Sequence, residues 1–331
     1  MRTFDYAVAG KESEAIGGTD KQMYLAGGTT LLDLVKLDVM QPDTVMDINT
    51  LPLKKIEKLS DGRLKIGALV TNTDLARDPT VESSYKVLAE ALLSGASTQL
   101  RNKATTGGNV MQKVRCHYFR DGVSNCNKRE PGSGCAAIGG LNRSVFAVLG
   151  TSDQCIASHP SDMCVAMAAI GATVEVTGPK GKRSIDFLDF HRLPGKTPQQ
   201  ETMLEPGELI THVTLDAPVK DAQSHYLKLR DRASYQFALA SSAVIVSISG
   251  GMIRDARIAL GGVGTKPWRA KEAEQSLVGQ PASEESFRKA AELAFAGAKA
   301  YEHNAFKIPL GKQAIIRSLM NVTSTDATNN A

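Results

Sequence analysis

The chain has 331 residues, of which 42% are hydrophobic and 22% are charged, an ordinary balance for a globular protein. Its net charge of +4 is too small to indicate a nucleic-acid-binding protein. The sequence has no run of about 18 apolar residues, which excludes a membrane-spanning helix. The length predicts two domains, or one domain with subdomains. Residues 1–6 lack the apolar segment of a secretory signal, so we expect no export signal in this chain.

The first part of the chain alternates predicted strands and helices, which is typical of an α/β domain. A strand at 22–25, a glycine turn at 26–30, a helix from residue 31 and a strand at 44–48 form a βαβ unit. A second unit has a strand at 63–67 and a helix at 83–96, where the apolar spacing fits a helical face. Farther along we predict a strand at 144–148, a helix at 162–170, a hairpin at 172–177 and 183–187, and a strand at 208–215.

The remainder has a different pattern, and a domain boundary fits at 217–221. Strands are predicted at 224–230, 240–249 and 252–260, and the Gly-Gly pair between the last two is a hairpin signal. Helices follow at roughly 270–278, 283–300 and 309–321. We therefore predict an α/β part followed by an α+β domain, and we expect the polar residues 323–331 to form a flexible tail.

Two glycine motifs precede or open predicted helices. Residues 25–31 read Leu-Ala-Gly-Gly-Thr-Thr-Leu, and residues 104–110 read Ala-Thr-Thr-Gly-Gly-Asn-Val. Glycine allows close backbone approach, and successive N–H groups there can bind phosphate oxygens. The alternative in each case is a plain tight turn. Two such loops in one domain suit a dinucleotide, although neither matches G-x-G-x-x-G, which argues against a Rossmann site.

Three cysteines, Cys116, Cys126 and Cys135, lie in a segment rich in Gly, Asn, Arg and Pro, and Cys155 follows. Buried structural cysteines usually lie among aliphatic residues, so disulfides, zinc or an iron–sulfur cluster could hold this segment together. The odd count of five cysteines disfavours disulfides, and the absence of a C-x₂₋₄-C pair disfavours zinc. A basic loop with free thiols is the remaining alternative. Cys164 lies in an apolar helical run and is expected to be a core residue.

The charges near these cysteines favour a cluster. The basic residues are Lys113, Arg115, Arg120, Lys128 and Arg129, against the acidic Asp121 and Glu130. Four thiolates are the usual ligands of an iron–sulfur cluster, and cationic neighbours favour a site of net negative charge.

Two further residues have both a structural and a functional interpretation. Asp162 caps the helix predicted at 162–170, or it accepts a hydrogen bond from a ribose hydroxyl. Lys228 lies in a basic stretch of a strand pattern. It is either a solvated edge residue or a cation placed near an anionic flavin or a phosphate.

Together these residues resemble the FAD-binding medium subunits of the molybdenum hydroxylases, the xanthine dehydrogenase and aldehyde oxidoreductase family. The resemblance covers nearly the whole chain, from Phe4 to about Leu319. It rests on motifs at 26–31, 66–68, 100–109, 161–162, 206–210, 259–263 and 266–268. The cysteine segment resembles a subgroup with an additional 4Fe-4S cluster. Residues 126–135 and 228–235 look closest to the flavin subunits of bacterial periplasmic aldehyde oxidoreductases.

The resemblance implies a PCMH-type FAD-binding domain at 1–217, with two α/β subdomains at about 1–52 and 53–217 and an iron–sulfur insert at about 113–157. It implies a C-terminal α+β domain at 222–322, an antiparallel sheet with helices, and then the tail at 323–331.

The resemblance also implies which residues bind the cofactors. The FAD pyrophosphate would be wrapped by Ala26, Gly27, Gly28, Thr29, Thr30 and Leu31. A second wall toward the flavin and its ribityl chain would come from Thr105, Gly108 and Asn109. Asp162 would bind the adenosine ribose or adjacent hydroxyls, Leu209 and Ile210 would pack near the ring system, and Lys228 would lie near the isoalloxazine. The 4Fe-4S cluster would be ligated by Cys116, Cys126, Cys135 and Cys155.

The implied function is electron transfer within a molybdenum-dependent aldehyde oxidoreductase, with substrate oxidation on a partner. A large subunit would hold the molybdenum cofactor, a small subunit would hold 2Fe-2S clusters, and this chain would pass electrons through FAD to an external acceptor. The alternatives are the flavin subunit of a xanthine dehydrogenase or hydroxybenzoyl-CoA reductase-like enzyme, or a stand-alone flavin reductase. The expected location is the periplasm, by co-export with a signal-bearing partner, or the cytoplasm.

Overall fold

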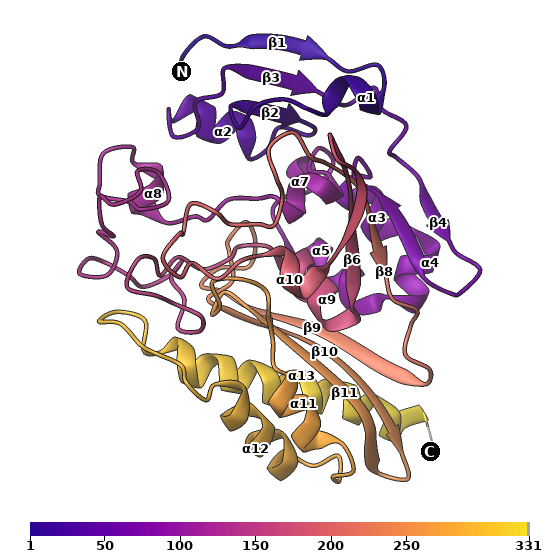
Figure 1. The fold of residues 1–331 in the computed structure, drawn as a ribbon. Coiled ribbons are helices and arrows are strands. Elements are labelled where there is room, and N and C mark those ends of the chain that lie inside the picture. Colours follow the sequence, from indigo (N-terminus) through magenta and orange to yellow (C-terminus); the bar gives the residue numbers. More distant parts are fainter. Residues whose placement is uncertain (330–331) are drawn as a thin grey trace.

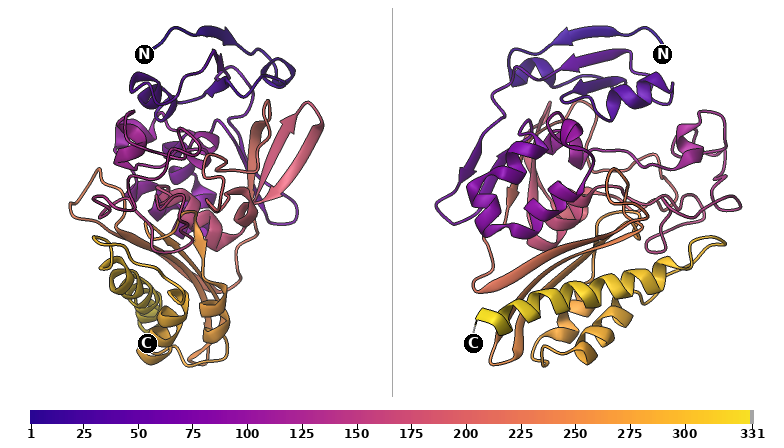
Figure 2. Two further views of the ribbon diagram at one scale, coloured as in Figure 1. Left: turned by 60° about the vertical axis from the view of Figure 1, so that its left-hand side comes forward. Right: turned by 180° about the vertical axis from the view of Figure 1, so that it is seen from behind.

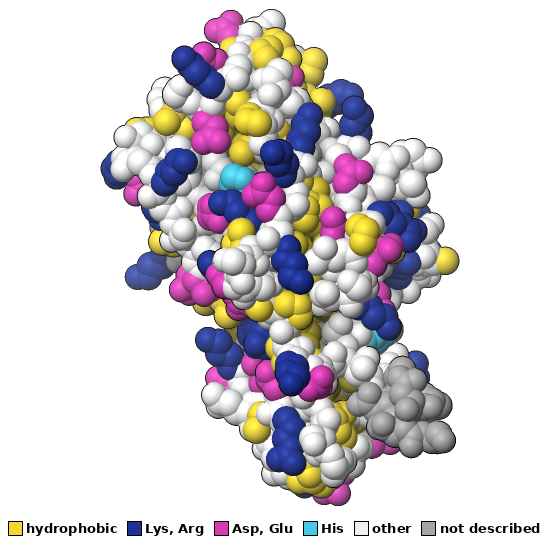
Figure 3. Space-filling model, turned by 90° about the vertical axis from the view of Figure 1, so that its right-hand side faces the viewer, with side chains coloured by type: hydrophobic (Ala, Val, Ile, Leu, Met, Phe, Trp, Pro, Cys, Tyr) yellow, Lys and Arg dark blue, Asp and Glu magenta, His cyan; other side chains and the backbone are white. Residues whose placement is uncertain are grey.

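The structure is a computed structural model that describes residues 1–329, with side chains described up to residue 323. Three sheets follow one another from the N-terminal to the C-terminal end of the molecule (Figure 1). On the face shown in Figure 3, basic and acidic side chains are interspersed, in agreement with the small net charge. Among the described residues, helices of the length and hydropathy needed to cross a membrane are absent.

The N-terminal sheet is parallel, with the strand order β1-β3-β2. Its strands are β1 (Asp5–Val8), β2 (Gln22–Leu25) and β3 (Thr44–Asp47), and its helices are α1 (Glu12–Ala15) and α2 (Leu31–Lys36). The predicted unit of β2, α2 and β3 is present. The sequence does not predict β1 and α1, because β1 is a short and mostly exposed edge strand without apolar alternation.

The middle sheet has the antiparallel order β4-β5-β8-β6-β7. Its strands are β4 (Ile56–Lys58), β5 (Leu64–Gly67), β6 (Ala172–Gly178), β7 (Gly181–Asp186) and β8 (Leu209–Leu215). The helices of this part are α3 (Asn72–Arg77), α4 (Pro79–Ser84), α5 (Lys86–Ser94), α6 (Thr98–Arg101), α7 (Thr106–Val110), α9 (Asp162–Ile170) and α10 (Phe187–Phe190). The α9 helix is buried from Met163 to Ile170 and forms the centre of the core.

The single helix predicted at 83–96 is wrong, because two helices, α4 and α5, meet at Tyr85. The Tyr85 backbone (φ −130°, ψ 44°) leaves the helical region, and its hydroxyl donates to the carbonyl oxygen of Asp216 at 2.9 Å. Asp78 caps α4, whose first position is Pro79. A capping signal and a tertiary hydrogen bond, and not the apolar periodicity, therefore set the helix boundaries here.

Residues 113–157 contain little regular structure, and Figure 2 shows them as loops beside the sheets. The helix α8 (His117–Arg120) is a single turn, and Cys126 and Cys135 form an isolated antiparallel bridge. The strand predicted at 144–148 is wrong. Phe146 forms an isolated bridge with Ala157, and the N–H groups of Val148 and Leu149 both donate to the carbonyl oxygen of Val263, so no ladder develops.

The C-terminal sheet is antiparallel, with the order β12-β11-β10-β9. Its strands are β9 (Ala222–Leu229), β10 (Ala240–Ser249), β11 (Met252–Gly261) and β12 (Trp268–Arg269), and its helices are α11 (Lys271–Leu277), α12 (Glu284–Ala294) and α13 (Lys307–Asn329). The helix α13 packs on β9 and β10 of this sheet. The helices α5 and α9, which belong to the middle part, pack on its opposite face (Figure 2). Val244 and Ile245 accordingly belong to different cores, as successive residues of a strand do.

The structure confirms the predicted order of a part with strands and helices mixed along the chain and an α+β domain with an antiparallel sheet. The second βαβ unit predicted from residue 63 does not form, because β5 pairs with β8 in an antiparallel sheet. The predicted helix ends differ in two places. The helix α12 ends at Ala294 and not at 300. The helix α13 begins at Lys307 and continues to Asn329, through much of the segment expected to be a flexible tail, and residues 330–331 lie outside the described part.

Candidate functional site

The turn between β2 and α2 lies directly against the loop that precedes α7. A Cβ atom added to Gly27 would lie 1.8 Å from the carbonyl oxygen of Lys103, so only glycine allows this approach. Gly28 has φ +72°, which glycine adopts without strain. The side-chain amide of Asn49 donates to the carbonyl oxygen of Ala26 at 3.0 Å and fixes the turn. The two glycine motifs, far apart in the sequence, therefore meet in space.

The second glycine motif forms the start of α7. Thr105 Oγ1 accepts a hydrogen bond from the N–H of Gly108 at 3.3 Å, which caps the helix. The side chain of Asn109 then reaches the next element of the site, because its Oδ1 accepts a hydrogen bond from Ser161 Oγ at 2.7 Å. Ser161 precedes α9, so both predicted walls and the start of α9 form one continuous surface.

Asp162 and Lys228 form a buried ion pair between the middle part and the C-terminal domain. Lys228 Nζ lies 2.7 Å from Asp162 Oδ2, and the two side chains are only 4% and 10% exposed. Tyr226 donates its hydroxyl hydrogen to Asp162 Oδ1 at 2.7 Å. Burial, and then the Asp162 charge, raise the pKa of Tyr226 well above its ordinary value, so Tyr226 remains a neutral donor.

This geometry decides between the structural interpretations of both residues. Ser161 Oγ, and not Asp162, caps α9, because it accepts the N–H of Cys164 at 3.0 Å. The interpretation of Asp162 as a helix cap is therefore wrong. Lys228 is not a solvated edge residue either, since its ammonium group is buried between Asp162 and the carbonyl oxygen of Ser94.

A cavity lies beside this ion pair, between the start of α9 and the C-terminal sheet. Its walls are formed by Arg115, Val145, residues 158–162, Phe237, Ala238, Ser241, Gly261 and Gly262. Among the described residues, three of its buried polar atoms lack a hydrogen-bond partner: Arg115 Nε, His159 Nε2 and Ser241 Oγ. Because buried polar groups are costly without partners, this cavity suits a polar ligand.

Arg115 connects three parts of the site, which its sequence context does not reveal. Its Nη2 donates to Thr30 Oγ1 of the first glycine motif at 3.4 Å. Its guanidinium lies 5.0 Å from the ring centre of Phe237, a cavity residue of the C-terminal domain. The next residue in the chain is Cys116. Arg115 thus links the glycine motifs, the cavity and the cysteine segment.

The four cysteines of the insert line one further cavity, and all four are free thiols: Cys116, Cys126, Cys135 and Cys155. Burial, and the proximity of the other thiols, raise the pKa of Cys116 to about 12. Burial raises the pKa of Cys155 to about 11. Backbone N–H groups hydrogen-bond to the sulfurs of Cys116, Cys135 and Cys155 and oppose the upward pKa shifts of these thiols, as they do for thiolates. Neighbouring thiolates in a buried cavity require a cation or a cationic cluster.

The spacing of these sulfurs does not fit one zinc ion. A tetrahedral zinc ion with Zn–S bonds of about 2.3 Å holds its sulfurs about 3.8 Å apart. Among the described residues, three ligand atoms within 4.8 Å of one another occur at His159, Cys164 and His191, and not among the four cysteines of the insert. The thiols therefore surround a larger space than a single ion fills.

Two family models together match most of the chain. The model of the FAD binding domain in molybdopterin dehydrogenase matches residues 2–218, and that of the CO dehydrogenase flavoprotein C-terminal domain matches residues 225–304. The chain is also 47% identical over 319 residues to the aldehyde oxidoreductase FAD-binding subunit PaoB of Escherichia coli, which covers 95% of this chain and 96% of that protein.

The chain belongs to the FAD-binding medium subunits of the molybdenum hydroxylases. It is 30% identical to the glyceraldehyde dehydrogenase medium chain of Sulfolobus acidocaldarius over 84% of this chain and 82% of that one. Its fold matches a chain of the carbon monoxide dehydrogenase from Hydrogenophaga pseudoflava with a TM-score of 0.76 and 26% identity, over 98% of both chains. The predicted family, its PCMH-type fold and the FAD cofactor are thereby confirmed.

The two remaining residues that we predict to contact the flavin ring, Leu209 and Ile210, lie in the protein interior. Leu209 and Ile210 are buried neighbours on β8, Leu209 in the core of the N-terminal part and Ile210 in the core around α9. Their packing against the flavin ring stays a prediction. Cys164 is fully buried in α9, as its apolar surroundings indicate.

Sequence reasoning missed a buried histidine pair behind the cavity. The rings of His159 and His191 are 4.6 Å apart between centres, and burial lowers the pKa of His191 to about 4. The N–H of Ser161 points at His159 Nδ1 at 3.4 Å, which places the proton on His159 Nε2. That nitrogen is then a hydrogen-bond donor toward the cavities and not a metal ligand.

Proposed function

We propose that this flavin subunit carries FAD and one 4Fe-4S cluster and transfers electrons in a heteromeric molybdenum-dependent aldehyde oxidoreductase. A large subunit with the molybdenum cofactor and a small subunit with 2Fe-2S clusters would be its partners, and an external acceptor would take the electrons. Two relatives support the aldehyde class, because one is named an aldehyde oxidoreductase subunit and the other a glyceraldehyde dehydrogenase chain.

One observation carries the cluster part of the proposal. Four free, mostly buried thiols line a single cavity, with backbone N–H groups directed at three of the sulfurs and a spacing too wide for one zinc ion. Iron–sulfur clusters are held by four cysteine thiolates, and hydrogen bonds to the sulfurs help to set their potentials. The donor set therefore fits a 4Fe-4S cluster better than it fits zinc or disulfides.

The FAD part follows from the two glycine motifs and the cavity beside Asp162. The turn at 26–31 and the start of α7 would hold the pyrophosphate and ribityl chain, while Asp162 still has lone pairs for a ribose hydroxyl. Arg115 places positive charge on the wall of the cavity and favours an anionic ligand there. Bound FAD supplies the chemistry of accepting electrons singly and releasing them in pairs.

The first test is cofactor content. The chain is co-expressed with its partner subunits and then separated from them under anaerobic conditions, so that the 2Fe-2S clusters of the small subunit do not contribute when its iron, zinc and flavin are counted. We expect about four irons per chain, as a cubane cluster requires, together with bound FAD. Serine substitutions of Cys116, Cys126, Cys135 and Cys155 should each lose iron, whereas Cys164→Ser, a buried cysteine outside the site, should keep it. A wild type with flavin and zinc but without iron would contradict the cluster.

The second test concerns the direction of electron flow. An aldehyde should bleach the flavin absorbance in the assembled complex and leave the isolated chain unchanged, because substrate oxidation would occur on the large subunit. Bleaching of the isolated chain by a reduced nicotinamide would instead support a stand-alone flavin reductase. Bleaching of the complex by xanthine or by a hydroxybenzoyl-CoA, and not by aldehydes, would reassign the substrate class.

A further inference from the structure

The five cations near the cysteines differ in what they contact, and four of them are held away from the sulfurs. Arg120 and Arg115 lie 2.8 Å and 3.6 Å from the carboxylate of Asp33 on α2. Arg129 Nη1 donates to two backbone carbonyl oxygens of α8. These three arginines tie the insert to its surroundings, and Lys113 is directed at Glu201.

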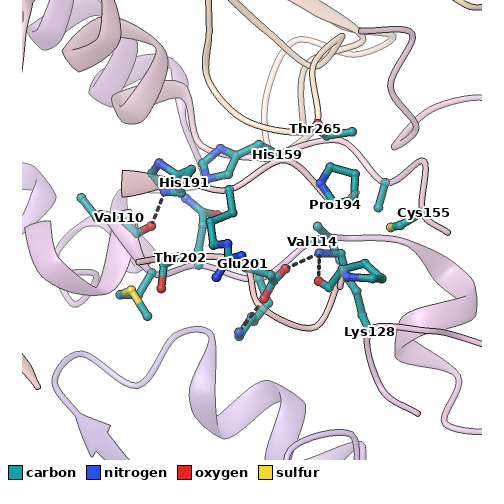
Figure 4. Close-up of a pocket in the computed structure, with 16 residues that line it drawn as sticks. Val110, Val114, Lys128, Cys155, His159, His191, Pro194, Glu201, Thr202 and Thr265 are labelled. Atoms are coloured by element: carbon teal, nitrogen blue, oxygen red, sulfur yellow. Dashed lines mark hydrogen bonds and ion pairs between the residues drawn. The ribbon is translucent and has the colours of Figure 1, made fainter. Parts of the chain in front are cut away.

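Lys128 is the cation that lines the cysteine cavity itself. Its side chain is 9% exposed, and its Nζ lies 2.9 Å from Glu201 Oε1 and 2.9 Å from the carbonyl oxygen of Pro198. Figure 4 shows Lys128, Glu201 and Cys155 in the same part of the molecule.

Glu201 anchors this lysine from a separate segment of the chain, between α10 and β8. Burial alone would neutralise Glu201, but the charges of Lys113 and Lys128 hold its pKa at about 2. The group of Lys113, Glu201 and Lys128 therefore contains two positive charges and one negative charge. Its one member that lines the cysteine cavity is Lys128, among the described side chains.

We propose that Lys128, held in place by Glu201, raises the reduction potential of the 4Fe-4S cluster. The inference rests on the proposed function, because it concerns the cluster. A cluster bound by four thiolates gains one negative charge when it takes up an electron. A fixed positive charge in a poorly solvated site stabilises that added charge, because the low local dielectric weakens it little. Glu201 opposes the effect through its own charge and supports it by orienting Lys128.

Two substitutions should shift the potential in opposite directions. In the complete complex, Lys128→Met removes the cation and should lower the midpoint potential of the cluster. We expect about a tenfold change in the ratio of reduced to oxidised cluster, which equals ~59 mV for one electron. Glu201→Gln removes the opposing charge, leaves Lys128 and Lys113 in place and should raise the potential. The readout is a redox titration of the cluster followed by electron paramagnetic resonance.

Two controls separate charge from structural damage. Lys128→Arg keeps the charge and should stay near the wild-type potential. Lys65→Met breaks a different half-buried ion pair, in which Lys65 Nζ lies 2.7 Å from Glu175 Oε2 on the middle sheet, and should leave the potential unchanged.

The outcomes distinguish this inference from the proposed function. A wild type without iron overturns both. A cluster of full iron content, whose potential stays the same in Lys128→Met and Glu201→Gln, overturns the role of Lys128 and leaves the proposed function standing. Where Lys128→Met loses its iron, Glu201→Gln decides: a raised potential supports the inference, and an unchanged or lowered one overturns it.

Discussion

The cysteine insert and the C-terminal domain keep their structures by different means. The insert has one helical turn and a small core in which cysteines lie among Leu34, Phe119, Phe146 and Ile156. The C-terminal sheet is covered by helices on both faces and has a large apolar core. Apolar burial therefore suffices for the C-terminal domain, whereas the insert depends on its side-chain contacts and, under the proposed function, on the cluster that its thiols would hold.

The largest expected effect is the loss of order in the insert without its cluster. Cys126→Ser should lose iron, and residues 113–157 should then exchange amide hydrogens and be cleaved by protease far faster, because the ligand links distant parts of the loop. Hydrogen exchange measured by mass spectrometry checks this. Protection in β10 and β11 should not change. An insert that keeps its protection without iron would show that its own contacts are sufficient.

In the C-terminal domain we expect the converse effect, a loss of stability without a loss of iron. Phe287 on α12 is 1% exposed and lies in that core, so Phe287→Ala should lower the free energy of unfolding by about 3–5 kcal/mol. Urea denaturation measures the loss. On the same helix, Leu293 is 44% exposed, and Leu293→Ala serves as the matched control with a small effect. Iron content per folded chain should stay at the wild-type value in both variants, and a parallel loss of iron would show that the two regions are coupled.

The Asp162–Lys228 ion pair, which joins the middle part to the C-terminal domain, should give the next effect. Asp162→Asn leaves the Lys228 ammonium buried without its counter-ion, at an expected cost of about 3 kcal/mol in the free energy of unfolding. This is the low end of the usual range, because Lys228 still donates to the carbonyl oxygen of Ser94 at 3.2 Å. FAD affinity should fall as well. In the double variant Asp162→Asn with Lys228→Met, the free energy of unfolding should largely recover, whereas the affinity for FAD should not. Equal recovery of stability and FAD affinity would mean that the ion pair is purely structural.

The two regions also differ in how well the sequence predicts them. In the C-terminal domain the apolar alternation predicts β10 and β11 nearly to the residue, because both strands run between two cores. In the insert the same reasoning predicts a strand at 144–148 that does not form, since those residues bond to 156 and 263 through tertiary contacts. Local patterns carry no information about such contacts.

The candidate site shows the same division. The glycine motifs could be recognised because glycine is required wherever backbones approach closely, as at Gly27. The cysteines could be recognised from their unusual polar surroundings. Arg115, His159 and Glu201 could not, because their roles depend on partners that are distant in the sequence.

The smallest effect, counted per pH unit, concerns a buried lysine inside the C-terminal domain, which tests whether apolar burial governs that domain throughout. Lys307 is fully buried, donates to the carbonyl oxygen of Gly262 at 2.6 Å, and has its pKa lowered by burial to about 7. The unfolded chain, with an ordinary lysine pKa of about 10.4, binds a proton above pH 7 that the folded chain lacks. Stability should therefore rise with pH between 7 and 10, by up to about 1.4 kcal/mol per pH unit from this group.

The matched variant isolates this group from the other titrating side chains. Lys307→Met cannot bind the proton, so its stability relative to the wild type should be greatest near pH 7 and should shrink as the pH rises. Urea denaturation of both proteins at several pH values between 7 and 10 measures the difference. Lys289→Met, at a solvent-exposed position of α12, should show no such dependence. Parallel curves for the wild type and Lys307→Met would mean that Lys307 keeps its proton in the folded domain and that this core accommodates a charge.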